Sequence, residues 1–310
     1  MIKPDSSELL PTYDVGGRLS AMEARLRGAG TATPFVTALT YNARGQREYI
    51  TYGNGSHTTY HYDEKTFRLT RLITTRNTGA DILQDLNYTY DPVGNIVEQI
   101  DNAQQTHYFN NVEVSPNGKY EYDPLYRLLK AEGRELIGLG APSETDVAIN
   151  ALPANTTALQ RYTQQFIYDE LGNIEQISHS ATSGSWNRYY HYNDPFFNNR
   201  LLSTSPDSVQ PSNDQYTYDT HGNMTAKPHL SAIAWDVADR LQSATNGTQT
   251  SYYTYDSAGE RVRKVVDKGS GLVHERIYIG DWEVYREIQG STVQLERETL
   301  HIAQLAGVCE

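Results

Sequence analysis

A short phrase recurs about ten times along this chain and constrains its fold more than any other feature. It reads aromatic, any residue, tyrosine, Asp or Asn, two further residues, Gly, Asn or Arg, and then an aliphatic residue. The clearest copies begin at Tyr88, Phe166, Tyr216 and Tyr253. The central aromatics lie at positions 13, 41, 62, 90, 122, 168, 192, 218, 235 and 255, mostly 17 to 32 residues apart. Such spacing indicates one strand–turn–strand unit that is reused along the chain.

A second form of the phrase ends in Arg-Leu. It begins at Tyr60 and Tyr120, and Trp235 begins a third copy with tryptophan in place of tyrosine. Weaker copies begin at Tyr13, Tyr41 and Tyr190.

The chemistry of the phrase predicts a β-hairpin. Two aromatics one residue apart lie on the same face of a strand, because side chains alternate with period two. The Asp or Asn that follows can bond its own backbone two residues on, which starts a turn. Glycine three residues after the acid adopts a left-handed φ at little cost. The chain is therefore predicted to be all-β, built from repeated antiparallel hairpins.

The residues expected to build this structural repeat are the second aromatic, the turn acid and the turn glycine. In the best copies they are Tyr62, Asp63, Tyr90, Asp91, Gly94, Tyr122, Asp123, Tyr168, Asp169, Gly172, Tyr218, Asp219, Gly222, Tyr255, Asp256 and Gly259. Composition agrees, because the chain has 24 tyrosines but 6 phenylalanines. Tyrosines concentrated in the repeats favour cross-strand aromatic contacts on a half-wet sheet.

We expect one domain over residues 1–310, with the repeats over about 13–285. Residues 132–160 contain several glycines and prolines and are predicted to form a long surface loop, in which a short helical turn stays open. The ends, 1–10 and 300–310, are expected to be frayed.

Composition excludes several classes of protein. The net charge of −12 argues against a nucleic-acid groove. The single cysteine, Cys309, excludes an internal disulfide and a cysteine-cluster metal site. No apolar run approaches the length of a membrane span, and the first residues do not resemble a signal peptide. Neither a cofactor nor a metal is predicted.

Three candidate chemistries have simpler structural explanations. The histidines are scattered and form no His-Glu-x-x-His motif, which favours strand surface positions. The repeated aspartates could form a glycosidase pair, but a residue present in every unit is better explained by closing every turn. Ser56 and His57 are adjacent, so on a strand they point to opposite faces and form no catalytic dyad. Exposed tyrosines could also form a platform that binds carbohydrate, and this interpretation stays open.

In these phrases the chain resembles YD-repeat, or RHS-repeat, proteins. The segment from Ser115 to Leu128 is similar to segments of the B and C components of bacterial insecticidal toxin complexes. The resemblance implies a continuous sheet that spirals into a hollow shell. It also implies that the shell encapsulates a toxin polypeptide and that its partners are other shell segments or another component of the toxin complex.

The same family has a core region with a protease-like pair of acids, to which we find no match, so no catalytic residue is carried over. The chain is expected to be a fragment of a larger shell and not an enzyme. Two alternatives stay open: a carbohydrate- or receptor-binding adhesin, and a glycoside hydrolase or residual autoprotease. The resemblance implies an extracellular complex whose parts reside in the bacterial cytoplasm before export.

Overall fold

The structure is a computed structural model that describes residues 2–76, 79–109, 111–137, 158–192, 198–206 and 214–302. It divides into two compact units, and each is described by itself. Unit 1 comprises Met1–Gly140, Leu152–Ile167 and Ser178–Trp186. Unit 2 comprises Ala141–Ala151, Tyr168–Ile177 and Asn187–Glu310. Whether the whole chain forms one domain stays a prediction.

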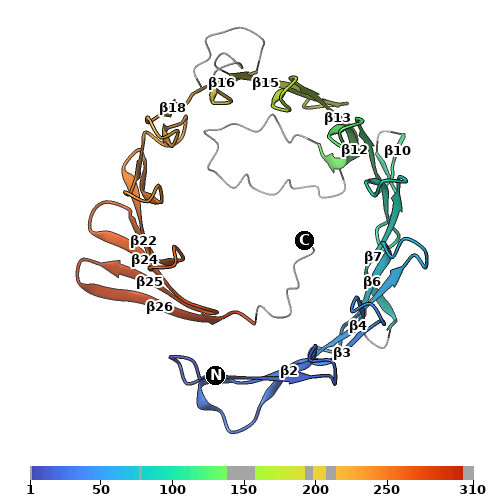
Figure 1. Cartoon of the computed structure of the whole chain (residues 1–310), viewed down its shortest axis with the longest axis horizontal. Helices are drawn as coiled ribbons and strands as arrows, with labels where there is room; N and C mark the ends of the chain where they lie inside the picture. The colour runs from blue at the N-terminus through green and yellow to red at the C-terminus, as the bar shows by residue number, and fades with distance from the viewer. Residues whose placement is uncertain are drawn as a thin grey trace. The chain divides into compact units, whose positions relative to one another are not determined.

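Unit 1 is built from antiparallel strands that lie side by side in chain order (Figure 1). They are β1 (Glu8–Tyr13), β2 (Leu19–Arg25), β3 (Thr33–Tyr41), β4 (Arg47–Tyr52), β5 (His57–Tyr62), β6 (Leu69–Arg76), β7 (Asp81–Tyr90), β8 (Ile96–Asp101), β11 (Gly118–Tyr122), β12 (Leu128–Leu136) and β13 (Leu159–Tyr168). A separate hairpin pairs β9 (His107–Phe109) with β10 (Val112–Val114). One 3-10 turn spans Leu26–Gly28.

Unit 2 continues the same antiparallel pattern. Its strands are β16 (Leu201–Ser205), β17 (Asp214–Gln215), β18 (Thr217–Tyr218), β19 (Met224–Ala226), β20 (Ala232–Trp235), β21 (Leu241–Asn246), β22 (Gln249–Tyr255), β23 (Arg261–Asp267), β24 (Leu272–Ile279), β25 (Trp282–Gln289) and β26 (Thr292–Leu300). The last seven form one sheet in chain order. Two further strands, β14 (Ile174–Ala181) and β15 (Trp186–Tyr192), have residues in both units, as does β13, whose last residue belongs to unit 2. The predicted all-β class and antiparallel hairpins are confirmed.

In nine of the repeats, the hairpin carries a β-bulge at the central aromatic. In the hairpin of β7 and β8, Thr89 faces Glu98 but Tyr90 faces Ile96, so Val97 is the extra residue. The same register shift occurs at Tyr13, Tyr41, Tyr62, Tyr122, Tyr192, Tyr218, Trp235 and Tyr255. Bulges bend a strand and increase its twist, so these repeat hairpins bend at the same position of the phrase.

Burial alternates along the repeat strands as the phrase predicts. Tyr88 and Tyr90 are half-buried, whereas Thr89 between them is exposed. Fully buried apolar residues are few and lie on neighbouring strands: Met22 faces Val36 across β2 and β3, with exposed fractions of 1% and 0%. A single hairpin has too little buried surface to be stable alone, so adjacent hairpins must support each other.

The structure differs from the predicted loop at residues 132–160. Strand β12 continues to Leu136 and β13 begins at Leu159, while 138–157, including the expected helical turn, lie outside the described residues. Gly133, which falls in that range, lies inside β12, where an added Cβ atom would come within 2.8 Å of the Tyr162 hydroxyl oxygen. This glycine permits close packing and does not end the strand.

Strands extend into both of the ends that were predicted to be frayed. Residues 8–10 belong to β1, where Leu9 faces Ala24, and Leu300 still pairs with Trp282. Residues 303–310, with Cys309, lie outside the described residues. Within the described part of the chain, no helix is long and apolar enough to cross a membrane.

Candidate functional site: the inter-repeat latch

The turn acid holds the hairpin turn together through its side chain. In the repeat at Tyr90, Asp91 Oδ1 accepts the N–H groups of Gly94 at 2.7 Å and Asn95 at 2.9 Å. The Asn95 amide donates to Asp91 Oδ2 at 2.8 Å. The same carboxylate-to-backbone bonding occurs at Asp14, Asp63, Asp123, Asp169, Asp219, Asp236 and Asp256. The predicted turn acids are thus all engaged in their own turns.

These hydrogen bonds favour the ionised form of Asp63, Asp91 and Asp236. The backbone N–H of Thr66 holds the pKa of Asp63 below its usual value, and that of Arg240 does the same for Asp236. At Asp91, burial acts to raise the pKa, but the Asn95 amide and the backbone N–H groups lower it by more. A carboxylate that accepts several N–H bonds is stabilised in its charged form.

The position three residues after the acid has a positive φ in copies of both forms of the phrase, and in the longer turn of the Tyr60 copy the residue with a positive φ is Phe67, four after Asp63, at 60°. Gly94 has a φ of 118°, and Gly172, Gly222 and Gly259 have φ values of 94°, 96° and 87°. In the Arg-Leu form the same position is filled by Tyr126, at 65°, or Asp239, at 56°. These two lie nearer the left-handed helical region, which non-glycine residues tolerate at a modest cost.

The second aromatic of each repeat connects its hairpin to the preceding one. Tyr90 donates its hydroxyl hydrogen to the carbonyl of Leu69, at 2.7 Å, where Leu69 is the residue that follows the previous turn. Tyr122 bonds the Ile96 carbonyl in the same way, at 2.9 Å. Equivalent bonds join Tyr41 to Leu19, Tyr62 to Arg47, Tyr192 to Ile174, Tyr218 to Leu201, Trp235 to Met224 and Tyr255 to Leu241.

The arginine of the Arg-Leu form adds a second connection. Arg68 donates to the Asp91 carbonyl at 2.9 Å, and its guanidinium carbon lies 5.7 Å from the centre of the Tyr90 ring. Arg240 reaches the Asp256 carbonyl at 3.3 Å and lies 5.1 Å from the Tyr255 ring. Arg18 makes the matching contacts with Asn42 and Tyr41. Such cation–π contacts contribute about 0.5–1 kcal/mol at exposed sites.

We call this paired contact the inter-repeat latch: an Arg-Leu pair of one repeat holds the aromatic and the turn acid of the next. The Gly-Asn form makes the aromatic half of the latch without the arginine: its Asn bonds the acid of its own turn, as Asn95 does with Asp91, whereas Arg18 and Arg240 bond both the acid of their own turn and a carbonyl of the next repeat. The two forms of the phrase therefore build the same turn, and they differ in whether an arginine adds a contact with the following repeat.

The latch brings together most of the sequence-predicted motif residues. Tyr62, Tyr90, Tyr122, Tyr218 and Tyr255 lie at latches, while Tyr168 ends β13. The phrase alone did not reveal the acceptor of each hydroxyl or the role of the arginines. The available signal was the regular order in which an Arg-Leu pair precedes the next Tyr-Asp pair.

The rival chemical sites do not assemble in the described residues. Ser56 donates to Asn54 at 2.6 Å, whereas His57 bonds Thr75 at 2.7 Å, so the two adjacent side chains have separate partners. No group of three or more His, Cys, Asp and Glu residues in the described ranges is arranged to hold a metal ion. The buried His179 lies between the rings of Tyr162 and Trp186, at 5.3 and 5.2 Å.

Comparison with known proteins places these repeats in context. Residues 149–268 match the teneurin YD-shell family. The toxin subunits YenC2 and YenC1 of Yersinia entomophaga are 30% and 33% identical to the chain over 92% and 91% of its length. The chain spans 30% of the length of each of these relatives.

Solved structures with the same strand arrangement come from toxin complexes. The TcdB2-TccC3 crystal structure without its hypervariable C-terminal region matches 96% of the chain, with 26% identity and a TM-score of 0.82. The Photorhabdus luminescens Tc holotoxin pore with the TccC3-D651A mutation matches 95%, with 27% identity and a TM-score of 0.81. The chain covers 14% of each of those chains.

Proposed function

The chain is a YD-repeat protein similar to toxin-complex subunits, and from this premise we propose that it is a wall segment of a shell that encapsulates and protects a toxin polypeptide. The role is mechanical, because a continuous wall keeps proteases from the polypeptide inside it. The inter-repeat latch is the observation that carries the proposal.

The latch supports a wall because it acts between repeats. The ladder between facing strands already joins consecutive hairpins, as it joins β6 to β7, and each latch adds a side-chain contact that fixes one hairpin relative to the next. One hydrogen bond contributes about 0.5–1.5 kcal/mol, so a series of them adds stability in proportion to the number of repeats. Stability that is shared between neighbours in this way is characteristic of repeat proteins.

The proposed role is non-enzymatic. The turn acids accept backbone N–H groups, and the pKa values of Asp63, Asp91 and Asp236 are lowered, whereas a general acid needs a raised pKa. The same bonds recur in every repeat, and catalysis would require one pair of acids that differs from the others. These features support a structural role for the acids over a glycosidase or protease role.

The proposed partners are further wall segments and the enclosed polypeptide. Strands β1 and β26 each pair with a neighbour on one side in the described sheets. Six consecutive residues of β26, from Thr292 to Arg297, are exposed. Open strand edges pair readily with further strands, so we assign these edges to adjoining parts of the same toxin complex. The complex acts outside the producing cell, and its parts are held in the bacterial cytoplasm before export.

Co-expression tests the proposal. The chain is produced with the polypeptide encoded downstream of it, and the purified material is treated with a non-specific protease. We expect the downstream polypeptide to survive longer with the chain than when it is produced alone. Equal rates of digestion with and without the chain would refute the proposal.

A further inference from the structure

A row of basic and aromatic side chains crosses four strands of unit 2. In register, Lys264 of β23 faces Arg276 of β24, Arg276 faces Tyr285 of β25, and Tyr285 faces Arg297 of β26. Neighbouring strands are about 4.8 Å apart, so the four side chains form a compact group on one face of the sheet. None of the four belongs to a repeat phrase, and the inter-repeat latch does not use them.

The row carries more positive charge than the described residues around it balance. Arg276 pairs with Glu283, but Lys264 and Arg297 have no carboxylate within ion-pair distance among the described residues. Lys264 and Arg276 directly face each other, and like charges in such positions destabilise a sheet. The chain as a whole has a net charge of −12, so this local excess of cations is unexpected.

Burial and the guanidinium groups of Arg261 and Arg276 lower the pKa of Lys264. A cation crowded in this way gains stability when an anion binds beside it.

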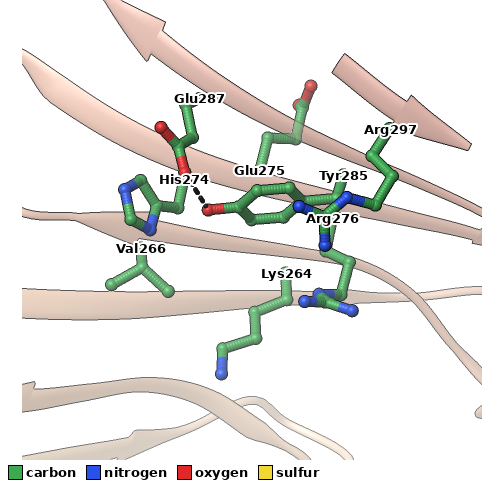
Figure 2. Close-up of a pocket in the computed structure, with 8 residues that line it drawn as sticks. All are labelled: Lys264, Val266, His274, Glu275, Arg276, Tyr285, Glu287 and Arg297. Carbon is green, nitrogen blue, oxygen red and sulfur yellow. Dashed lines mark hydrogen bonds between the residues drawn. The ribbon is translucent and has the colours of Figure 1, made fainter. Parts of the chain in front are cut away.

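The row borders a hollow of about 400 Å³ that is large enough for one sugar-sized ring. Figure 2 shows the Tyr285 ring between Glu287 on one side and the guanidinium groups of Arg276 and Arg297 on the other. The guanidinium carbon of Arg276 lies 5.1 Å from the centre of the Tyr285 ring. The hollow therefore combines cations with an aromatic face.

The hollow also has a hydrogen-bond acceptor. Glu287 accepts the Tyr285 hydroxyl at 2.9 Å through one carboxylate oxygen. His274 meets the Tyr285 ring edge-on, with centres 5.8 Å apart. A ligand that carries only a simple carboxylate, such as acetate, would be repelled by Glu287 and would offer it no hydrogen. A ligand with hydroxyl groups as well as a carboxylate satisfies both sides of the hollow.

We propose that the hollow formed by Lys264, Arg276 and Tyr285, with Glu287 and Arg297, binds an acidic sugar. The carboxylate pairs with Arg297 beside Tyr285, the sugar ring packs on Tyr285, a ring hydroxyl donates to Glu287, and Lys264 at the other end of the row donates to a sugar oxygen. Aromatic faces and apolar sugar faces pack well, and ionic hydrogen bonds fix the orientation. The inference does not depend on encapsulation, since a wall segment with or without cargo has the same hollow.

Ligand-observed NMR titration of the whole chain tests the site with sodium glucuronate, glucose and sodium acetate as probes. We expect glucuronate to bind with a dissociation constant on the order of 1–10 mM, and glucose and acetate to bind at least about tenfold more weakly. Lys264→Met and Arg297→Gln should each weaken glucuronate binding about tenfold, because each removes one charge-assisted contact. The control is Lys119→Gln, which removes an exposed lysine of β11 and should leave binding unchanged.

Two results would overturn the proposal. In the first, glucuronate binds no better than acetate or glucose, which needs no variant to observe. In the second, Lys119→Gln weakens binding as much as Lys264→Met, which would mean that glucuronate responds to the net charge of the chain and not to the hollow. Neither result bears on protease protection of a downstream polypeptide, so failure here is distinct from failure of the wall function.

Discussion

Removing one hydroxyl from the inter-repeat latch tests whether the repeats hold each other. In Tyr90→Phe the ring stays in place, but the hydrogen bond of 2.7 Å to the Leu69 carbonyl is lost. A hydrogen bond of this kind contributes about 1 kcal/mol, and Leu69 is half-buried, so water can partly replace the lost donor. We therefore expect Tyr90→Phe to reduce the free energy of unfolding by about 1 kcal/mol.

The assay is urea unfolding followed by circular dichroism. With a denaturant slope of about 3 kcal/mol/M, the expected loss lowers the midpoint by about 0.3 M. The matched control is Tyr108→Phe, because Tyr108 is 74% exposed and makes no hydrogen bond through its hydroxyl in the described residues. Equal midpoints for Tyr90→Phe and Tyr108→Phe would refute the claim that the hydroxyl of the latch contributes to stability.

Further predictions concern the turns and the response to pH. Gly94→Ala should lower the free energy of unfolding by about 1–2 kcal/mol, because alanine resists a φ of 118°. Tyr126→Gly should change the free energy of unfolding by less than about 0.5 kcal/mol, since relief of backbone strain offsets the added entropy of the unfolded chain. The urea midpoints of the two variants test both values. Asp91→Asn should lower the melting temperature and alter no other property, and loss of a catalytic activity with unchanged melting would argue for the enzyme alternative. Burial raises the pKa of Tyr90 above its usual 10.0, so its contribution is fully present below pH 10 and is lost as the pH rises through the folded-state pKa; a melting temperature that stays constant above pH 10 would contradict this. In acid the sign is opposite: the lowered pKa of Asp63 makes its contribution present above pH 3.8 and lost as the pH falls through the folded-state pKa, which acid titration followed by circular dichroism would detect.

The local parts of the fold could be predicted from the sequence, because they depend on residues close together in the chain. The turn acid and the left-handed position lie within five residues of each other, so the phrase determines the bend. The alternation of Tyr88, Thr89 and Tyr90 likewise follows from the period of a strand. These contacts require no knowledge of which strands are neighbours.

The latch could not be predicted, because its partners belong to different repeats. The Leu69 carbonyl lies 21 positions before Tyr90, and only the register of β6, β7 and β8 brings the two together. The two forms of the phrase looked like variation in the turn, although the arginine of one form acts on the next repeat. The close packing at Gly133 could not be predicted for a related reason, since the Tyr162 ring beside it comes from another strand.

The row of basic side chains could not be predicted from the sequence for the same reason. Lys264, Arg276 and Arg297 are separated by more than ten residues in each step, and no motif links them. They become neighbours through the registers of β23 to β26, where the repeat phrase is absent. A sequence pattern reports contacts within one hairpin, whereas a site on a sheet is assembled from several.

The protease half-life of the downstream polypeptide, measured with the intact chain and with a chain carrying Tyr62→Phe, Tyr90→Phe and Tyr122→Phe together, tests the central claim most directly. If latched repeats form a protective wall, the intact chain lengthens the half-life and the triple variant shortens it again at a temperature where both chains remain folded. An equal half-life for the two chains and for the polypeptide alone would contradict the account.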